Sequence, residues 1–210
     1  GLDFGTRELA ILAELCGRYL VTEPLIDTLT IASTVLLRSE HAAALIPDVI
    51  SGDLIAIAAI DEPTSGSRLS PSSTLVQTKS GWHLQGKKYW ISAGASATHF
   101  AVLADSCNGL AWVLVPKSAQ GANCETFATH DGRGGANCDF DLPISDDQIL
   151  LMGDAATEAL SAFRECAMTL SSAETLGAAQ AALDTTVDYT KQREQFGQPL
   201  ASFQALQHRM

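Results

Sequence analysis

The sequence predicts a mixed α+β fold in which a helical N-terminal layer, a strand-rich middle and a second helical segment follow one another. Three observations lead to this prediction. Apolar residues recur every three or four positions through residues 6–50, short β-like runs broken by turn residues occupy residues 54–142, and residues 154–196 contain almost no glycine or proline. We therefore expect a helical domain over 1–50, a β-barrel or β-sandwich domain over 51–150 and a helical domain over 151–210.

Apolar periodicity predicts the helices of the first layer. The first helix is expected over residues 6–20, and further apolar stretches at 25–37 and 40–50 end at the turn signal of residues 51–53. Seven runs then predict the strands of the middle domain, at 54–60, 74–78, 82–92, 100–103, 110–115, 124–126 and 138–142.

The last third of the chain predicts one long helix and the start of another. Asp154 is suited to cap the long helix, which we expect to reach residue 196. Gly197 then fits the position after a helix, and Pro199 fits the first turn of the next one.

Composition excludes several classes of protein. Of the 210 residues, 46% are hydrophobic and 18% are charged, which is typical of a globular chain. The formal net charge of −11 disfavours binding to nucleic acid or to an anionic membrane surface. No apolar run approaches the roughly 20 residues of a membrane span. Because the chain opens at Gly1 without Met or a basic leader, we expect a cut or processed start.

Cysteine and histidine spacing predicts no metal site. The five cysteines are widely separated and form no C-x-x-C pair, so we expect mostly buried thiols in a reducing cytoplasm; they are Cys16, Cys107, Cys124, Cys138 and Cys166. The histidines are isolated from one another. The glycine-rich segment 132–135 precedes a strand-like run instead of opening a helix, which favours a flexible β loop over a phosphate cradle.

The most informative segment is residues 189–200, Tyr-Thr-Lys-Gln-Arg-Glu-Gln-Phe-Gly-Gln-Pro-Leu, followed by Phe-Gln-Ala-Leu-Gln-His at 203–208. It closely resembles the helix-turn-helix of the acyl-CoA dehydrogenase family, with its R-x-x-F-G-x-P and F-Q-x-x-Q elements. Residues 61–67 resemble the family's T-E-P-x-x-G-S strand end, and residues 90–94 resemble its W-I-[ST]-N-[GA] strand. The resemblance covers nearly the whole chain and implies an incomplete subunit, truncated at both ends.

The resemblance implies that the chain binds FAD, and the residues can be matched to that chemistry. An isoalloxazine ring needs an aromatic wall and hydrogen-bond donors at its edge. Trp90 is the expected wall and Ser92 the expected donor, because strand alternation sends both to one side. The alternative for Trp90 is a place in the core. Ile60 and Asp61 are further cofactor contacts that the resemblance implies.

Arg193 is the expected partner of the cofactor's phosphates, since a guanidinium can bind two oxygens at once. In the family, the matching Arg and Phe reach the flavin nucleotide of a neighbouring subunit, so the resemblance implies an oligomer. It also assigns Phe196, Phe203 and Gln204 to the cofactor. The alternatives are a solvated ion pair of Arg193 with a neighbouring carboxylate, and plain packing at the turn.

Gly66 and Ser67 are expected near the flavin, and Ser67 also near the substrate, a CoA thioester. Asp61 departs from the family's usual Thr, and Ala58 stands where an aromatic residue is common. A carboxylate beside a flavin carbonyl disfavours the anionic reduced ring.

The implied reaction removes a proton from Cα and a hydride from Cβ of the thioester, which requires a carboxylate base. In most of the family that base lies in a C-terminal segment that this chain does not contain, so no catalytic base is assigned. Glu165 and Glu174 are the nearest carboxylates, and they lie on opposite faces of the predicted helix.

Three hypotheses follow for the function. The first is FAD-dependent oxidation of a lipid, dicarboxylate or sterol-derived acyl-CoA to the trans-2-enoyl-CoA, as in β-oxidation, in a cytoplasmic dimer or tetramer with an electron-transferring flavoprotein as acceptor. The second is a non-catalytic or half-site subunit of a heteromeric acyl-CoA dehydrogenase of bacterial type. The third is a flavin-dependent monooxygenase or nitroalkane oxidase on the same fold.

Overall fold

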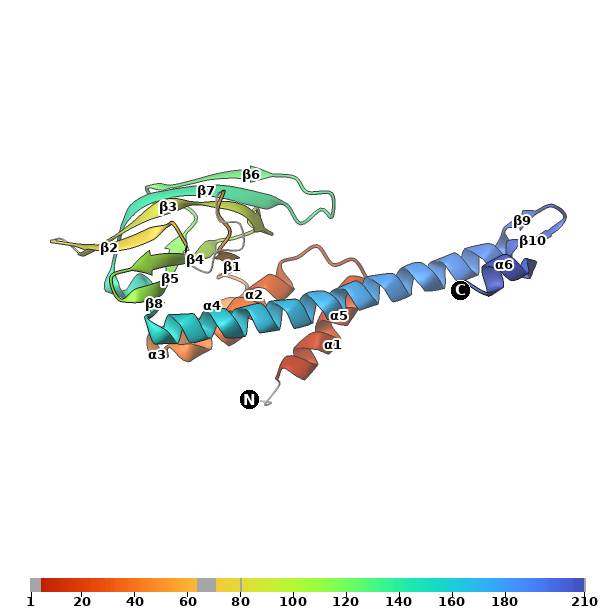
Figure 1. The fold of residues 1–210 in the computed structure, drawn as a ribbon, viewed down its shortest axis with the longest axis horizontal. Coiled ribbons are helices and arrows are strands. Elements are labelled where there is room, and N and C mark those ends of the chain that lie inside the picture. Colours follow the sequence, from red (N-terminus) through yellow and green to blue (C-terminus); the bar gives the residue numbers. More distant parts are fainter. Residues whose placement is uncertain (1–4, 64–70, 80, 210) are drawn as a thin grey trace. The chain divides into compact units, whose positions relative to one another are not determined.

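The computed structural model describes residues 5–63, 71–79 and 81–209, and they form two compact units (Figure 1). The larger unit contains residues 22–167. The smaller contains the chain up to Val21 together with the segment from Met168 onwards. Helix α5 (Asp154–Gln192) contributes to both. The three-domain division expected from the sequence stays a prediction.

One sheet dominates the larger unit. Its eight described strands run in the order β6-β7-β3-β2-β4-β5-β8, with β1 added in parallel to β4. The strands are β1 (Ala56–Ala59), β2 (Thr74–Thr78), β3 (Gly81–Ser92), β4 (His99–Ser106), β5 (Gly109–Pro116), β6 (Ala122–Phe127), β7 (Gly135–Ile144) and β8 (Ile149–Met152). All seven expected strands are present. The sequence did not predict β8, because a short run of apolar residues alone does not distinguish a strand from a buried helix.

The sheet curls so that its two ends share a core (Figure 1). Phe100 on β4 and Phe140 on β7 are separated by two strands in the sheet order, yet their ring centroids lie 6.2 Å apart in an edge-to-face contact. Both side chains are fully buried, and Leu84 and Val113 belong to the same cluster. The mixed α+β fold with a β-barrel-like middle is therefore confirmed.

Helices cover the outer face of β1, β4 and β5. They are α2 (Leu25–Thr34), η1 (Leu36–Arg38), α3 (Glu40–Ala43), α4 (Ile46–Ser51) and the first turns of α5. The stretch 40–50, expected as one apolar segment, is divided, with Pro47 in the first turn of α4. Trp112 is fully buried beneath these helices, and its Nε1 donates a hydrogen bond to the carbonyl oxygen of Ala156 at 3.2 Å.

In the smaller unit, α1 (Thr6–Arg18) packs directly on α5 through two glycines. A Cβ atom on Gly17 would lie 1.8 Å from the carbonyl oxygen of Glu174, and one on Gly177 would lie 1.9 Å from that of Glu14. Each glycine therefore lets one helix backbone approach the other more closely than any larger residue allows.

The long helix ends earlier than the sequence predicts. Helix α5 stops at Gln192 instead of continuing to residue 196, and a small hairpin follows, formed by β9 (Glu194–Gln195) and β10 (Gln198–Pro199). Phe196 and Gly197 form its turn, both with positive φ, which suits a two-residue hairpin. Gly197 is thus a hairpin residue and not a helix end. After η3 (Leu200–Ser202), helix α6 (Gln204–Gln207) follows.

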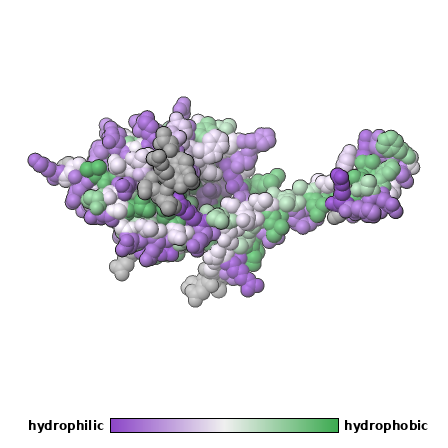
Figure 2. All heavy atoms as spheres, viewed as in Figure 1, coloured by the Kyte–Doolittle hydropathy of each residue, from purple (hydrophilic) through white to green (hydrophobic). Residues whose placement is uncertain are grey.

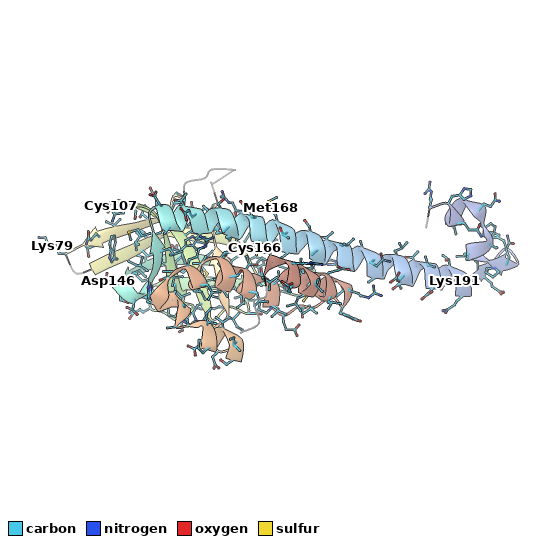
Figure 3. All side chains as sticks on the ribbon, turned by 90° about the horizontal axis from the view of Figure 1, so that it is seen from below. Lys79, Cys107, Asp146, Cys166, Met168 and Lys191 are labelled. Carbon is cyan, nitrogen blue, oxygen red and sulfur yellow. A yellow bond between two sulfur atoms is a disulfide. The ribbon has the colours of Figure 1, made fainter. Side chains whose placement is uncertain are left out.

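Two of the five cysteines are not thiols. Cys124 and Cys138 are directly opposed on β6 and β7, with Cα atoms 4.1 Å apart, and form a disulfide. Cysteine spacing did not predict this bond, because only the strand register brings the two residues together. Cys16 and Cys166 are buried thiols as expected, whereas Cys107 is exposed after β4 (Figure 3).

Gly177→Ala tests the contact between α1 and α5. In a free helix alanine is more favourable than glycine by about 1 kcal/mol. Here the added methyl group meets the backbone of Glu14, so we expect a net loss of about 2 kcal/mol from overpacking, measured by urea denaturation. Ala179→Gly, at an exposed position of α5, is the matched control and should cost about 1 kcal/mol. A gain in stability for Gly177→Ala would contradict the close approach of the helices.

Candidate functional site

A β-bulge in β3 brings Trp90 to the surface of the larger unit. The register with β7 shifts between Lys88 and Ile91, so Tyr89 and Trp90 together oppose Asn137 alone. Trp90 has a φ of 51° and is 68% exposed, whereas Lys88 is fully buried. Strict alternation would place Trp90 on the buried side with Lys88. The bulge reverses the alternation between Lys88 and Trp90, whereas Trp90 and Ser92 lie on the same exposed side, with Ile91 buried between them, as expected. Trp90 is not part of the core.

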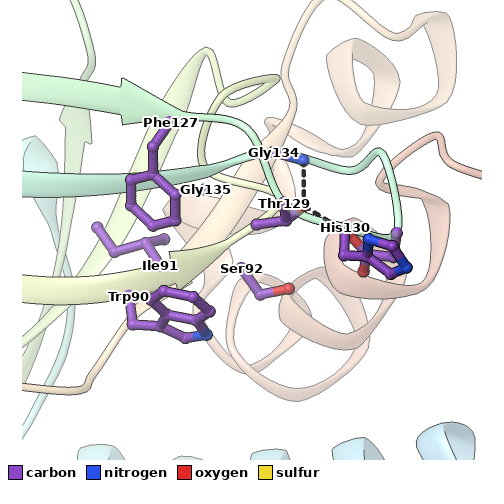
Figure 4. Close-up of a pocket in the computed structure, with 9 residues that line it drawn as sticks. Trp90, Ile91, Ser92, Phe127, Thr129, His130, Gly134 and Gly135 are labelled. Carbon is purple, nitrogen blue, oxygen red and sulfur yellow. Dashed lines mark hydrogen bonds between the residues drawn. The ribbon is translucent and has the colours of Figure 1, made fainter.

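Trp90 and Phe127 form the aromatic wall of a cavity of about 310 Å³ (Figure 4). Their ring centroids are 5.1 Å apart and the ring planes are inclined by 34°. Ser92, at the end of β3, lines the same cavity with its hydroxyl group. The expected wall and donor thus share one concave site. Its other lining residues are Ile91, Thr129, His130, Asp131, Gly134 and Gly135.

The loop between β6 and β7 closes one side of this cavity. Thr129 Oγ1 accepts a hydrogen bond from the Gly134 amide at 2.9 Å and donates one to the carboxylate of Asp131. The Arg133 amide also donates to the Asp131 carboxylate. The hydrogen bond from Thr129 and, after it, the one from the Arg133 amide lower the pKa of Asp131. A Cβ atom on Gly135 would lie 2.5 Å from the Phe127 ring, so a larger residue here would force the ring to shift.

A buried ion pair anchors the chain after β1. Lys88 Nζ donates to Glu62 Oε1 at 2.7 Å and to the carbonyl oxygen of Ile60 at 3.2 Å. Ser72 and Ser73 donate further hydrogen bonds to the Glu62 carboxylate, from both amide and hydroxyl groups. Burial opposes ionisation of Glu62, but these donors outweigh it and lower its pKa to about 2. Burial lowers the pKa of Lys88, and the attraction of Glu62 works against that shift.

This anchor holds the backbone of two predicted cofactor contacts. The carbonyl oxygen of Ile60 accepts from Lys88, and that of Asp61 accepts from the Tyr89 amide at 2.9 Å. Ile60 is half-buried and Asp61 is exposed. Both are therefore tied to the strand that carries Trp90.

The remaining expected cofactor residues lie in the smaller unit. Arg193 directly follows α5, and its carbonyl oxygen accepts from the Leu200 amide at 2.8 Å, which closes the hairpin. Phe196 is 90% exposed at the hairpin turn, and its ring meets that of Phe203 edge to face at 6.3 Å. Gln204 is exposed at the start of α6.

The other expected residues divide into two groups. Gly66 and Ser67 lie outside the described residues. Glu165 is exposed on α5, and Glu174 packs its backbone against Gly17. Neither glutamate lines the cavity beside Trp90. The catalytic base stays unassigned.

Sequence reasoning missed Phe127, which forms part of the aromatic wall. It also missed His130 and Asp131, which line the same cavity, and Asn137, which opposes the bulge. The glycine-rich segment 132–135 was the available signal, since it marked a loop between two strands. It could not show that the loop lies against Trp90, because that contact follows from the β3–β7 pairing.

Within the described part of the chain, no three His, Cys, Asp or Glu side chains come together as metal ligands would. None of its helices combines the length and the apolar character that crossing a membrane requires.

Two family profiles match the sequence. "Acyl-CoA dehydrogenase, middle domain" matches residues 58–142, and "Acyl-CoA dehydrogenase, C-terminal domain" matches residues 156–210. Between them they cover about two thirds of the chain, and the first includes the bulge, the aromatic wall and the loop.

Individual proteins and solved structures are also similar to the chain. The 3-sulfinopropanoyl-CoA desulfinase of Paraburkholderia xenovorans is 34% identical over 176 residues, or 76% of this chain and 44% of the relative. The solved structure "Tcur3481-Tcur3483 steroid ACAD G363A variant" is 30% identical with a TM-score of 0.81, over 97% of this chain and 55% of that one. A glutaryl-CoA dehydrogenase from Mycobacterium smegmatis in complex with FADH2 is 26% identical with a TM-score of 0.70, over 86% of this chain and 47% of that one.

The chain belongs to the acyl-CoA dehydrogenase family. It spans about half the length of the curated relatives it matches.

Lys88→Met tests the buried pair. It leaves the Glu62 carboxylate buried without its cation, so we expect a loss of about 3–5 kcal/mol at neutral pH, measured by denaturant unfolding. Lys87→Met is the matched control, because Lys87 pairs with Asp139 at the surface at 2.6 Å. It should cost less than about 1 kcal/mol. Equal losses in the two variants would contradict the role of the pair.

The pair also predicts the acid response of the fold. Because folding lowers the pKa of Glu62 to about 2, its contribution to stability is complete above the unfolded pKa and disappears as the pH falls through the folded one. The unfolded value is about 4.3. Unfolding free energies measured between these limits should fall more steeply for the wild type than for Lys88→Met/Glu62→Gln. Parallel pH profiles would exclude Glu62 as the source.

Proposed function

We propose that the chain belongs to a FAD-dependent enzyme that oxidises an acyl-CoA thioester to the trans-2-enoyl-CoA. One observation carries the proposal: an indole that is 68% exposed stands against Phe127 as the flat wall of a cavity. A tryptophan exposed to this extent on a strand has a large apolar surface that a planar ring can cover. Family membership and the FADH2-bound glutaryl-CoA dehydrogenase support the choice of cofactor.

The residues around the cavity fit a flavin ring. The wall is apolar, the Ser92 hydroxyl supplies a donor, and the volume lies within the range of ligand cavities. FAD supplies a hydride acceptor when it is bound. In our proposal Ile60, Asp61, Trp90 and Ser92 contact the ring.

The other assignments follow the family motifs. Arg193 binds the cofactor's phosphates, and Phe196, Phe203 and Gln204 contact the nucleotide of a neighbouring subunit. Gly66 and Ser67 approach the cofactor, and Ser67 also the thioester. An electron-transferring flavoprotein accepts the electrons. We retain a cytoplasmic location as a prediction.

A specific observation favours a second candidate, a half-site or non-catalytic subunit of a heteromer. Glu165, the expected carboxylate of α5 that belongs to the larger unit, does not line the cavity. Figure 2 shows hydrophobic side chains along the smaller unit, where Met168, Leu176 and Leu183 are all exposed. A related subunit that covers this face and completes the site would explain both, and one similar structure carries two protein names in its title.

An absorption spectrum of the protein, with and without any partner that co-purifies, separates these candidates. Flavin bands that bleach on anaerobic addition of acyl-CoAs support the dehydrogenase and identify its substrate class. A colourless protein that becomes yellow only with its partner supports the half-site subunit. Bound flavin that no thioester bleaches contradicts both and favours the monooxygenase or nitroalkane-oxidising alternative.

Trp90→Ala tests the wall. Stacking of a base-like ring on an aromatic side chain contributes about 1–3 kcal/mol, so we expect the affinity for FAD to fall by about tenfold or more. Flavin fluorescence titration of the apoprotein measures the dissociation constant. The control is Trp82→Phe on the same strand, whose indole bonds to Asp146 instead of lining the cavity. Unchanged affinity in Trp90→Ala would refute the assignment of the wall.

A further inference from the structure

The indole of Trp90 is largely exposed, and its described ring contact is with Phe127. Trp90 and Phe127 line the cavity described above (Figure 4), and they also line a second one of about 440 Å³. Tyr89, Glu125, Thr126 and Asn137 complete the second cavity. Because the indole is 68% exposed, side-chain packing restrains it little beyond the contact with Phe127. The backbone conformation of Trp90 therefore contributes strongly to the direction in which the indole points.

That backbone has a conformation that tryptophan rarely adopts. At a φ of 51°, the Cβ atom of a bulky residue crowds its own main chain, so Trp90 does not reach this region by preference. The amides of the two bulge residues bond outside the ladder with β7. The Tyr89 amide donates to the carbonyl oxygen of Asp61, and the Trp90 amide donates to Asn137 Oδ1, each at 2.9 Å.

Asn137 combines two features needed to fix this conformation. It is the single residue of β7 that opposes the bulge, and its side-chain oxygen replaces the carbonyl oxygen that a regular ladder would offer. Its neighbour Cys138 is tied to β6 by the disulfide, so the acceptor stands on a restrained strand. A side chain without an acceptor would leave the Trp90 amide unpaired.

We propose that Asn137 is a positioning residue, which holds the bulge of β3 and thereby fixes the Trp90 indole as the wall against which the flavin ring lies. The part that concerns the flavin rests on the proposed function. Asn137 acts through the Trp90 main chain and needs no contact with the cofactor. The requirement is for an acceptor oxygen at this position, so aspartate should replace asparagine and alanine should not.

The test uses the full chain, with its partner if one co-purifies, labelled with 5-fluorotryptophan. The three tryptophans give three fluorine resonances, and Trp90→Phe assigns that of Trp90. In Asn137→Ala we expect this resonance alone to shift or broaden, and the affinity for FAD to fall about tenfold, the equivalent of one positioned hydrogen bond. Asn137→Asp should restore both readouts. Asn123→Ala, at an exposed position on β6, is the matched control.

Each outcome decides a separate point. If Asn137→Ala leaves the Trp90 resonance unchanged, the positioning role is wrong. If the resonance moves but the affinity for FAD does not, Asn137 positions Trp90 without serving the cofactor, and the proposal is overturned in that part. If the wild type binds no FAD, the proposed function fails, while the resonance still decides whether Asn137 positions the indole. If the Trp82 and Trp112 resonances move equally, the substitution disturbs the whole fold and a positioning role is excluded.

Discussion

Two residues of β3 that are close in sequence point to opposite sides of the sheet, and the candidate site depends on this reversal. Lys88 is fully buried against Glu62, whereas Trp90 stands out at 68% exposure. The bulge at 89–90 separates them, because one inserted residue exchanges the faces of all that follow. The buried pair fixes the inner side and also holds the Ile60 carbonyl oxygen, so the turn after β1 and the aromatic wall are anchored to one strand.

The curled sheet gives this strand a rigid base. Leu84 and Ile91 of β3 lie in the core shared by β4 and β7, and the helices on the other face bury Trp112. The wall itself stands at the rim, where β6 and β7 extend into the loop that carries His130 and Asp131. A close-packed interior deforms little, so strands that extend from it can hold exposed aromatic side chains at defined positions.

The sequence predicted the strands of the fold better than it predicted the geometry of the candidate site. Periodicity located seven of the eight described strands of the sheet, and three motifs placed the chain in its family. Alternation correctly placed Trp90 and Ser92 on one side of β3, but it did not predict the bulge that turns both away from the side of Lys88. The bulge, the Cys124–Cys138 bond and the contact with Phe127 all depend on pairing between distant strands. Local sequence patterns do not predict which distant strands pair. The early end of α5 was missed similarly, because Phe196 and Gly197 together suit a hairpin turn as well as a helix end.

Charge constrains what the cavity can hold. The chain has a net charge of −11, and hydrogen bonds lower the pKa of Asp131, so this carboxylate is ionised at neutral pH on the cavity wall. Asp131 pairs with Arg133, whose Nε lies 4.0 Å from the Asp131 carboxylate. A negatively charged group is disfavoured here, while an uncharged planar ring is not. In the proposed assignment the ring of the cofactor, and not its phosphates, lies against Trp90 beside Asp131. That choice follows from electrostatics as well as from the family motifs, because the phosphates carry the negative charge of the oxidised cofactor.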